Sequence, residues 1–295
     1  MILESVPNFS EGRRPEVARA IADEARRAGA TVLDLTWDAD HHRGVLTFAG
    51  EPARVEAAAF AVAKKSLELI DLNRHQGKHP RMGALDVLPF VPLGGADLAD
   101  AVAMARRVGE RIGSALQCPV FLYEAAASRP ERRNLATLRA PRFEGLRDLV
   151  GRDPAWAPDF GPARIHPTGG AVAVGARPPL VAFNIDLETA DVAVARSIAR
   201  SIRERDGGLP GVKALGLYLD QRACAQVSMN LVDIARTRVV DVYKAVERLA
   251  GQAGTSIRAG ELIGLVPRAA LSEEEARGLR LYEFSPARIL ENRLP

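Results

Sequence analysis

Five histidines supply the side chain best suited to proton transfer near neutral pH, and four of them fall in two short loops. His41 and His42 lie in one loop, His75 and His79 lie in another, and His166 stands alone. An imidazole can accept and then donate a proton within one catalytic cycle because its pKa lies close to physiological pH. A histidine taken singly is more often structural, but four in two loops at the ends of predicted strands point to general acid–base chemistry.

The loop that carries His79 has a composition that holds it in a fixed shape. Glycines and prolines recur through residues 75–83, where they restrict the backbone or let it approach a ligand closely. Residues 84–91 then form an apolar run with one carboxylate, Asp86, and such a run predicts a buried strand. A cationic loop that opens into a core strand can present an imidazole to an anionic ligand. On composition alone, a surface turn with solvated charges fits the same residues.

Several classes of active site are absent from the sequence. No Walker-type phosphate loop is present, and no glycine fingerprint follows the first predicted strand. The spacing of cysteine and histidine fits no zinc site, so we expect no metal, and no serine sits in a nucleophile elbow. Cys118 and Cys224 lie in apolar runs, which predicts two buried free thiols in a reducing compartment. With no signal-like start and no apolar run long enough to span a bilayer, we expect a cytoplasmic protein with no membrane partner.

Length and composition favour two domains and exclude a nucleic-acid partner. The chain has 295 residues, of which 47% are apolar and 26% are charged, enough apolar material for two cores. The formal net charge is only +3, far below what nucleic-acid binding normally shows. Aromatic residues make up 5%, so the predicted strands lack the stacking side chains that RNA-binding sheets use.

The predicted elements follow a βαββαβ order in each half of the chain. In the first half we expect strands at residues 2–7, 31–36, 45–49 and 84–91, with helices at 15–28 and 52–70. A helix at 96–116 and a strand at 120–123 extend this half. In the second half we expect strands at 180–186, 212–219, 224–233 and 256–265, with helices at 190–205 and 239–250. The order is typical of the split-βαβ sandwich. We therefore predict an α/β (α+β) fold of two subdomains, 1–178 and 179–295, each a mixed sheet of ferredoxin-like type with helices on one face.

Three remaining segments are assigned by composition. The breakers in residues 175–179 are expected to separate the two halves, and residues 273–294 to form a charged helix. Residues 124–160 are rich in arginine and proline, with helical fragments near 132–138 and 143–150. The arginines of that stretch form either a basic wall or a solvated face: Arg129, Arg132, Arg133, Arg139, Arg142, Arg147 and Arg152.

Several blocks of the sequence resemble the glutamate formiminotransferase family. The segment His79-Pro80-Arg81-Met82-Gly83-Ala84-Leu85-Asp86-Val87 is similar to the central motif of that family. Further matching blocks occur in the family's order: Val6-Pro7-Asn8-Phe9-Ser10-Glu11-Gly12, Trp156-Ala157-Pro158-Asp159-Phe160-Gly161-Pro162, Gly175-Ala176-Arg177, Ala182-Phe183-Asn184-Ile185, Ala225-Gln226-Val227-Ser228 and Gly264-Leu265-Val266-Pro267. Together they span roughly residues 4–270. The resemblance implies transfer of a formimino group from N-formimino-L-glutamate to N5 of tetrahydrofolate, which gives 5-formiminotetrahydrofolate and glutamate in histidine degradation and one-carbon metabolism.

The resemblance also assigns roles to residues around the two histidine loops. It makes His79 the catalytic acid and base, whereas His75 matches no position of the motif, so His75→Ala is expected to cost less than tenfold in turnover. Arg81 and Arg43 are expected to bind carboxylates of the glutamate part, because a guanidinium fork fits a carboxylate. His42 stands where the family usually has asparagine and is a further polar contact. Alternatives remain open: a structural Arg81 paired with Asp86 or a backbone carbonyl, and a hydrogen-bond network at the strand end around Arg43.

The same resemblance places folate on a glycine- and proline-rich segment. Its residues are Gly161, Pro162, Ala163, Arg164, Ile165, His166, Pro167, Thr168, Gly169 and Gly170. A flat pterin fits a shaped slot of this kind between two domains. Without the resemblance, the breakers alone would predict an interdomain linker.

The expected protein is a transferase without the cyclodeaminase domain that many relatives carry, and a homodimer by resemblance. Its partners are formiminoglutamate and tetrahydrofolate as co-substrate. Two other functions fit the same features. One is formyl transfer between 5-formyltetrahydrofolate and glutamate on the same site, and the other is a non-catalytic folate-binding protein. The intact His79 loop argues against the binder, since a binder has no use for a placed base.

Overall fold

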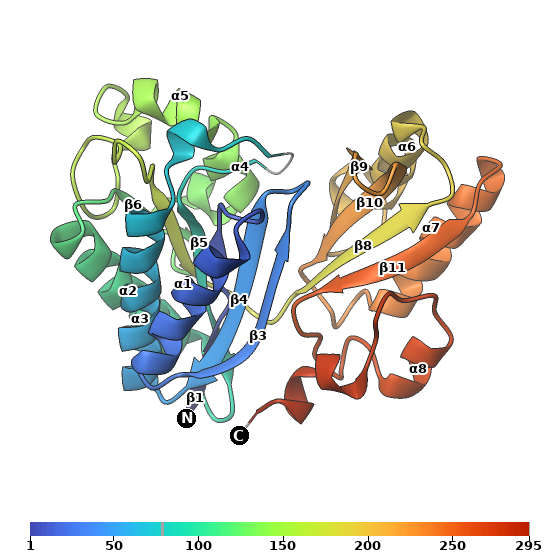
Figure 1. The fold of residues 1–295 in the computed structure, drawn as a ribbon, viewed down its shortest axis with the longest axis horizontal. Helices are drawn as coiled ribbons and strands as arrows, with labels where there is room; N and C mark the ends of the chain where they lie inside the picture. The colour runs from blue at the N-terminus through green and yellow to red at the C-terminus, as the bar shows by residue number, and fades with distance from the viewer. Residues whose placement is uncertain (78–79, 295) are drawn as a thin grey trace. The chain divides into compact units, whose positions relative to one another are not determined.

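The computed structural model describes residues 1–77 and 80–294. The chain divides into two compact units, Met1–Arg177 and Pro178–Pro295, and each has its own β-sheet (Figure 1). Helices and strands alternate in both, which confirms the predicted α/β class with two subdomains. Gly175, which was expected to open the break between the halves, lies inside a strand and is aligned with Pro89 and Tyr123 of its two neighbouring strands.

The first unit is built on a seven-stranded sheet. Its regular elements are β1 (Ile2–Ser5), β2 (Asn8–Phe9), α1 (Pro15–Arg27), β3 (Thr31–Asp38), β4 (Arg43–Gly50), α2 (Pro52–Leu69), β5 (Leu85–Leu93), α3 (Leu98–Ala115), β6 (Val120–Glu124) and β7 (Val172–Ala176). The strand order is β1-β4-β2-β5-β7-β6, with β3 on the outer side of β4. Strands β5, β7 and β6 run parallel, and the remaining pairs are antiparallel. The strand expected at residues 2–7 is broken into β1 and β2, and β7 was not predicted.

Local sequence sets the helix ends of the first unit. Proline begins α1 and α2 at the position where a missing amide costs nothing. Gly29, with φ +86, follows α1 in the left-handed conformation that glycine adopts without strain. Asp97 and Asp100 form a capping box at the start of α3. The apolar faces of these three helices cover one face of the sheet (Figure 1).

Residues 125–171 cover part of the opposite face of the same sheet. They include α4 (Leu135–Arg139) and α5 (Arg142–Leu149), whose buried residues Leu138 and Leu146 share an apolar cluster with Phe121 on β6. Arg132 anchors this segment: it is 2% exposed, lies 2.6 Å from the Asp159 carboxylate and donates to the carbonyls of Ala155 and Ala157. The arginines of this stretch therefore include a buried structural member as well as exposed ones.

The second unit has the predicted βαββαβ order. It consists of β8 (Val181–Leu187), α6 (Val192–Ile202), β9 (Val212–Leu219), β10 (Cys224–Leu231), α7 (Val239–Gln252) and β11 (Ile257–Ile263). The four strands form an antiparallel sheet in the order β11-β8-β10-β9. Alternate residues of the strands, such as Phe183, Ile185 and Val227, pack with α6 and α7 on one face. This is the ferredoxin-like arrangement predicted from the pattern.

The prediction of a single charged helix at residues 273–294 is wrong. Helix α8 (Glu273–Arg277) ends at Gly278, and only short 3₁₀ turns follow, at Pro286–Arg288 and Leu290–Asn292. Pro286 would interrupt a helix, and the tail also has apolar residues that the second core takes up, since Ile289 is fully buried. The bridges Gly260–Leu281 and Val266–Ile289 hold the tail against the sheet unit.

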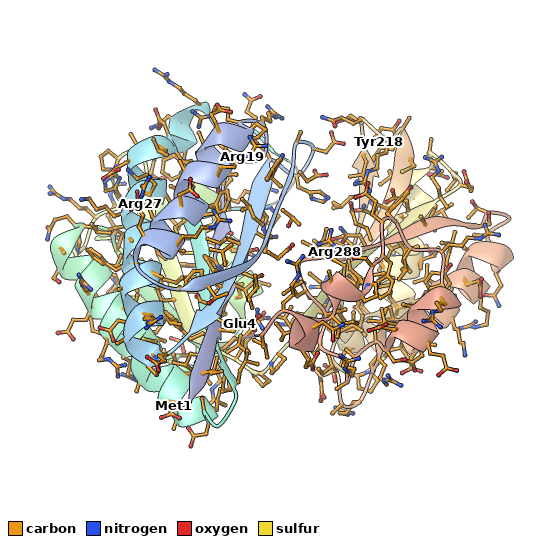
Figure 2. All side chains as sticks on the ribbon, turned by 60° about the horizontal axis from the view of Figure 1, so that its bottom comes forward. Met1, Glu4, Arg19, Arg27, Tyr218 and Arg288 are labelled. Atoms are coloured by element: carbon orange, nitrogen blue, oxygen red, sulfur yellow. The ribbon has the colours of Figure 1, made fainter. Side chains whose placement is uncertain are left out.

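Surface arginines show the contrast with the buried ones. Arg19 and Arg27 project from α1 (Figure 2). The guanidinium carbon of Arg19 lies 5.3 Å from the centroid of the Trp37 ring on β3, while Arg27 pairs with Glu24 on its own helix. These contacts lie on the surface of the first unit, whereas the polar groups around the two histidine loops are enclosed.

Candidate active site

A small pocket forms where the ends of three strands meet. Strand β2 pairs with β4 on one side and β5 on the other, so the turn before β4 and the loop before β5 are brought together. The residues that line the pocket are Phe9, Ser10, His41, His42, Arg43, His75, Arg81 and Asp86. The sheet therefore unites the two histidine loops that the sequence analysis singled out.

His42 is buried and uses both ring nitrogens. Its Nδ1 lies 2.9 Å from the carbonyl oxygen of Gln76, and its Nε2 lies 3.2 Å from Oε1 of Glu11. Both partners are oxygens that accept hydrogen bonds, so a proton on either ring nitrogen has an acceptor within reach. The backbone of His42 has φ +50, a region in which asparagine and histidine are enriched among residues with side chains.

Glu11 is the hydrogen-bond partner of His42 and is 2% exposed. Burial raises the pKa of its carboxyl, but hydrogen bonds from His42, from Arg14 and from the Arg13 and Arg14 amides outweigh it and lower the pKa to about 2. The Nη2 of Arg14 lies 2.5 Å from Oε2 of Glu11. Glu11 is therefore a carboxylate at all physiological pH values. Glu11 belongs to the block Val6–Gly12 that resembles the family's opening motif, but the sequence alone indicates no role for it.

His75 is buried and its ring is stacked on that of His42. Its Nε2 lies 2.8 Å from the carbonyl oxygen of His42, which can only accept, and its Nδ1 accepts the Nε–H of Arg81 at 2.9 Å. These partners specify a neutral ring with its proton on Nε2. Burial is the main cause that lowers the pKa of His75 to about 4. The centroids of the His42 and His75 rings are 4.0 Å apart, with 11° between the planes.

Arg81 is held at its inner and outer edges. Besides its bond to the His75 ring, it donates from Nη2 to the His75 carbonyl at 3.2 Å. Its Nη1 and Nη2 bind the two carboxylate oxygens of Glu144 at 3.1 and 2.8 Å. Glu144 projects from α5 with 60% of its side chain exposed, whereas the Arg81 side chain is 11% exposed. Arg81 thus forms a bidentate ion pair with a carboxylate of the protein itself, that of Glu144, and its predicted contact with the substrate stays a prediction.

The carboxylate of Asp86 forms its ion pair with Arg139 and not with Arg81. Its Oδ1 accepts the Met82 amide at 2.8 Å, and its Oδ2 pairs with the guanidinium of Arg139 on α4. Arg43 lies close to the same carboxylate. Burial and the charge of Arg139 lower the pKa of Arg43 to about 9, although the charge of Asp86 opposes the shift. Two guanidinium groups thus lie in the field of one buried carboxylate.

The predicted catalytic residue, His79, lies with Lys78 outside the described residues. The residues on either side are placed: the Gln76 carbonyl binds His42, and Arg81 lines the pocket. Gly77 packs so closely against the other histidine loop that a Cβ there would lie 2.6 Å from the His41 carbonyl oxygen and 2.8 Å from the Cβ of His42. Only glycine fits at that position.

The glycine- and proline-rich segment 161–170 belongs wholly to the first unit. The Leu72 amide donates to the Thr168 carbonyl, and the Ala84 amide donates to the Gly169 carbonyl, each at 2.9 Å. Gly170 adopts φ +71, and a Cβ there would lie 2.2 Å from the Met82 carbonyl oxygen. The segment is therefore bonded to both ends of the His75 loop and is not the interdomain linker that breakers alone would predict.

His166 shapes this segment from within. Its amide and carbonyl pair with Gly170, and its Nδ1 accepts the Gly169 amide at 2.9 Å. Burial lowers the pKa of His166. The ring is therefore neutral with its proton on Nε2, and it closes the turn that presents Pro167 and Thr168.

Among residues 1–77 and 80–294, no three His, Cys, Asp or Glu side chains lie together as metal ligands would. No helix within those residues is both long and apolar enough to cross a membrane.

Fold and pocket together define a two-unit α/β protein whose first unit encloses histidines and arginines, groups suited to bind carboxylates and to move protons. The chain belongs to the formiminotransferase family. Residues 2–177 match the model of the formiminotransferase domain, N-terminal subdomain, and residues 182–276 match that of the formiminotransferase domain.

Curated relatives share nearly the whole chain. A glutamate formimidoyltransferase of Streptococcus pyogenes serotype M1 is 42% identical over 99% of this chain and 98% of its own length. A glutamate formimidoyltransferase of Thermoplasma acidophilum is 38% identical over 99% and 97% of the two chains. The formimidoyltransferase-cyclodeaminase of Rattus norvegicus is 39% identical over 93% of this chain and 52% of its own length. Among solved structures, a microcompartments protein of Desulfitobacterium hafniense aligns with a TM-score of 0.22 and 10% identity, which is too distant to bear on the fold.

Proposed function

We propose that this protein is a glutamate formimidoyltransferase, which transfers the formimino group from N-formimino-L-glutamate to N5 of tetrahydrofolate. The observation that carries the proposal is the similarity, along almost the full chain, to two proteins of that name. The pocket supports it because the donor is a dicarboxylate and the pocket supplies guanidinium groups. Tetrahydrofolate is a co-substrate in this reaction and no metal is required by it.

The reaction needs one proton to leave and one to arrive. The N5 amine attacks the amidine carbon of the donor, and a tetrahedral intermediate forms. A proton leaves N5, and the nitrogen of glutamate takes up a proton as its bond to the transferred carbon breaks. One imidazole can perform both transfers in turn. We assign this role to His79 from the motif, and the two ends of its loop reach the pocket through Gln76 and Arg81.

The donor's carboxylates have two candidate partners. Arg43 lines the pocket, and a guanidinium group at that position suits a carboxylate of the donor. The Arg81 fork already holds a carboxylate, that of Glu144, in a bidentate arrangement. A donor carboxylate at Arg81 therefore exchanges with Glu144, whose exposed side chain can swing into solvent. His42 adds a further polar group to the same pocket.

Folate is assigned to residues 161–170. Their backbone is held by His166 and by bonds to Leu72 and Ala84, so the segment is a preformed surface next to the His75 loop. A rigid segment beside the catalytic loop suits a flat pterin whose N5 must meet the donor.

We further assign residues 1–178 to the N-terminal subdomain and residues 179–295 to the C-terminal subdomain. We also propose that the protein is a cytoplasmic homodimer. Light scattering of the purified protein tests whether it is a dimer.

A spectrophotometric transfer assay tests the function. Formiminoglutamate with tetrahydrofolate should give 5-formiminotetrahydrofolate, and the rate should exceed that of formyl transfer between 5-formyltetrahydrofolate and glutamate. Faster formyl transfer would make that reaction the main activity. Tight folate binding with no turnover of either donor would identify a folate-binding protein.

A further inference from the structure

We propose that His75 is a positioning residue that acts through Arg81: its neutral ring fixes the guanidinium in the orientation that receives a carboxylate of the donor. This inference rests on the proposed transferase function. The motif that implied the function left His75 without a role, and the structure places its ring at the centre of the polar network.

The ring of His75 can do this only in one protonation state. Its Nδ1 lone pair accepts the Nε–H of Arg81 at 2.9 Å, and its Nε2–H donates to the His42 carbonyl at 2.8 Å. A proton on Nδ1 would face the Arg81 Nε–H and break the first bond. Burial of the ring, which is 7% exposed as a residue, favours the neutral form that the bonds require.

The bond to Nδ1 determines where the guanidinium fork points. A guanidinium is planar, so holding Nε at the ring and Nη2 at the His75 carbonyl leaves its outer edge facing one direction. That direction is occupied by the two oxygens of Glu144 at 2.8 and 3.1 Å. Glu144 thereby marks a position that accepts a carboxylate in bidentate geometry. A donor that replaces Glu144 meets a fork already oriented, so less conformational freedom is lost on binding.

Two substitutions separate the halves of the His75 ring. An asparagine amide oxygen stands near the position of Nδ1, so His75→Asn keeps an acceptor for Arg81. A glutamine amide nitrogen stands near the position of Nε2, so His75→Gln keeps the donor to His42 and loses the acceptor for Arg81. We expect His75→Gln to raise the donor KM by roughly tenfold or more, as loss of a bond to a charged group predicts. His75→Asn should leave the donor KM within about threefold of wild type, and both should leave the tetrahydrofolate KM unchanged.

A third comparison tests whether the effect passes through Arg81. In an Arg81→Ala background, His75→Gln should add nothing to the donor KM, because the group it orients is gone. Val62→Ala serves as the stability control: Val62 is fully buried on α2, which contributes no lining residue, so its truncation should lower Tm without changing the donor KM.

The outcomes are distinguishable. Equal donor KM increases in His75→Asn and His75→Gln, or a loss of Tm with unchanged KM in both, would reduce His75 to a structural role. An additional KM increase from His75→Gln in the Arg81→Ala background would show that His75 does not act through Arg81. A wild-type protein that transfers no formimino group would overturn the proposed function itself, whereas an active wild type with either pattern above overturns only this inference.

Discussion

The rings of His42 and His75 lie flat on one another, with centroids 4.0 Å apart, although the two residues are 33 positions apart in the chain. Both ring nitrogens of His42 lie near accepting oxygens, and the partners of His75 make it a donor and an acceptor. A ring bonded to the Glu11 carboxylate is therefore stacked on a neutral one. Arg81 selects the tautomer of His75, so this ring has a defined protonation state before any substrate arrives.

The Glu11–His42 pair predicts a stability contribution that disappears in acid. The folded-state pKa of Glu11 is about 2, against an ordinary value of 4.5, so the folded protein binds fewer protons at this group than the unfolded chain. Its contribution is complete above about pH 4.5 and is lost as the pH falls towards about 2. Urea unfolding should therefore show a gap between wild type and Glu11→Gln that narrows over this interval. A gap of constant size would contradict the assignment.

His79→Ala should lower kcat by about 10²- to 10⁴-fold while folate still binds, since that is the usual contribution of general acid–base catalysis. The wild-type profile of kcat/KM against pH should show an ionisation near roughly 6.5, shifted by at most about one unit, and the variant should lose it. Near-normal turnover by His79→Ala would remove His79 from the mechanism. The family assignment would survive that result.

Arg43→Ala should raise the donor KM by roughly one to two orders of magnitude, because a charge-assisted hydrogen bond contributes about 1.5–3 kcal/mol. Arg43→Lys should recover only part of the loss, since an ammonium group cannot form the planar fork. The same pair of substitutions at Arg81 should behave alike. Steady-state kinetics with formiminoglutamate measure both, and an unchanged donor KM in both alanine variants would exclude these arginines from donor binding.

Glu144→Gln should lower the donor KM, because the internal carboxylate that competes for Arg81 is neutralised. The Glu144 side chain is 60% exposed, so the gain is modest, about fivefold at most for an ion pair of this kind. Glu131→Gln is the matched control, since Glu131 is exposed in the same segment and lies outside the pocket lining. A higher donor KM in Glu144→Gln would mean that Glu144 supports Arg81 and does not compete with the substrate.

Arg132→Ala should destabilise the first unit by about 3–5 kcal/mol, because it leaves the carboxylate of Asp159 without its buried partner. Arg133→Ala, at the exposed neighbouring position, should change the free energy of unfolding by less than about 0.5 kcal/mol. Urea denaturation of the two variants provides the comparison. Equal stability would show that Arg132 does not anchor residues 125–171.

The sequence by itself determined the features that depend on neighbours along the chain. The βαββαβ order of the second unit followed from local periodicity. The alternation of apolar and polar residues in a strand, and their helical spacing in a helix, each depend only on residues within one element. The helix starts at Pro15 and Pro52 could be predicted from the sequence for the same reason. The family motifs named the loop that contains His79, and the sheet brings both of its flanks to the pocket.

Tertiary structure decided which polar residues are enclosed and what they bind. Strand β7 is a short run whose partners, β5 and β6, are distant in the chain, so no local pattern revealed it. Arg132 and Arg133 are adjacent and chemically identical, yet Arg132 is buried in an ion pair with Asp159 while Arg133 is exposed. The pairing of Asp86 with Arg139, and of Arg81 with Glu144, spans 53 and 63 positions. Charge states and tautomers depend on such contacts because they are set by the atoms that surround a side chain in space, and those atoms come from segments that only the folded sheet brings together.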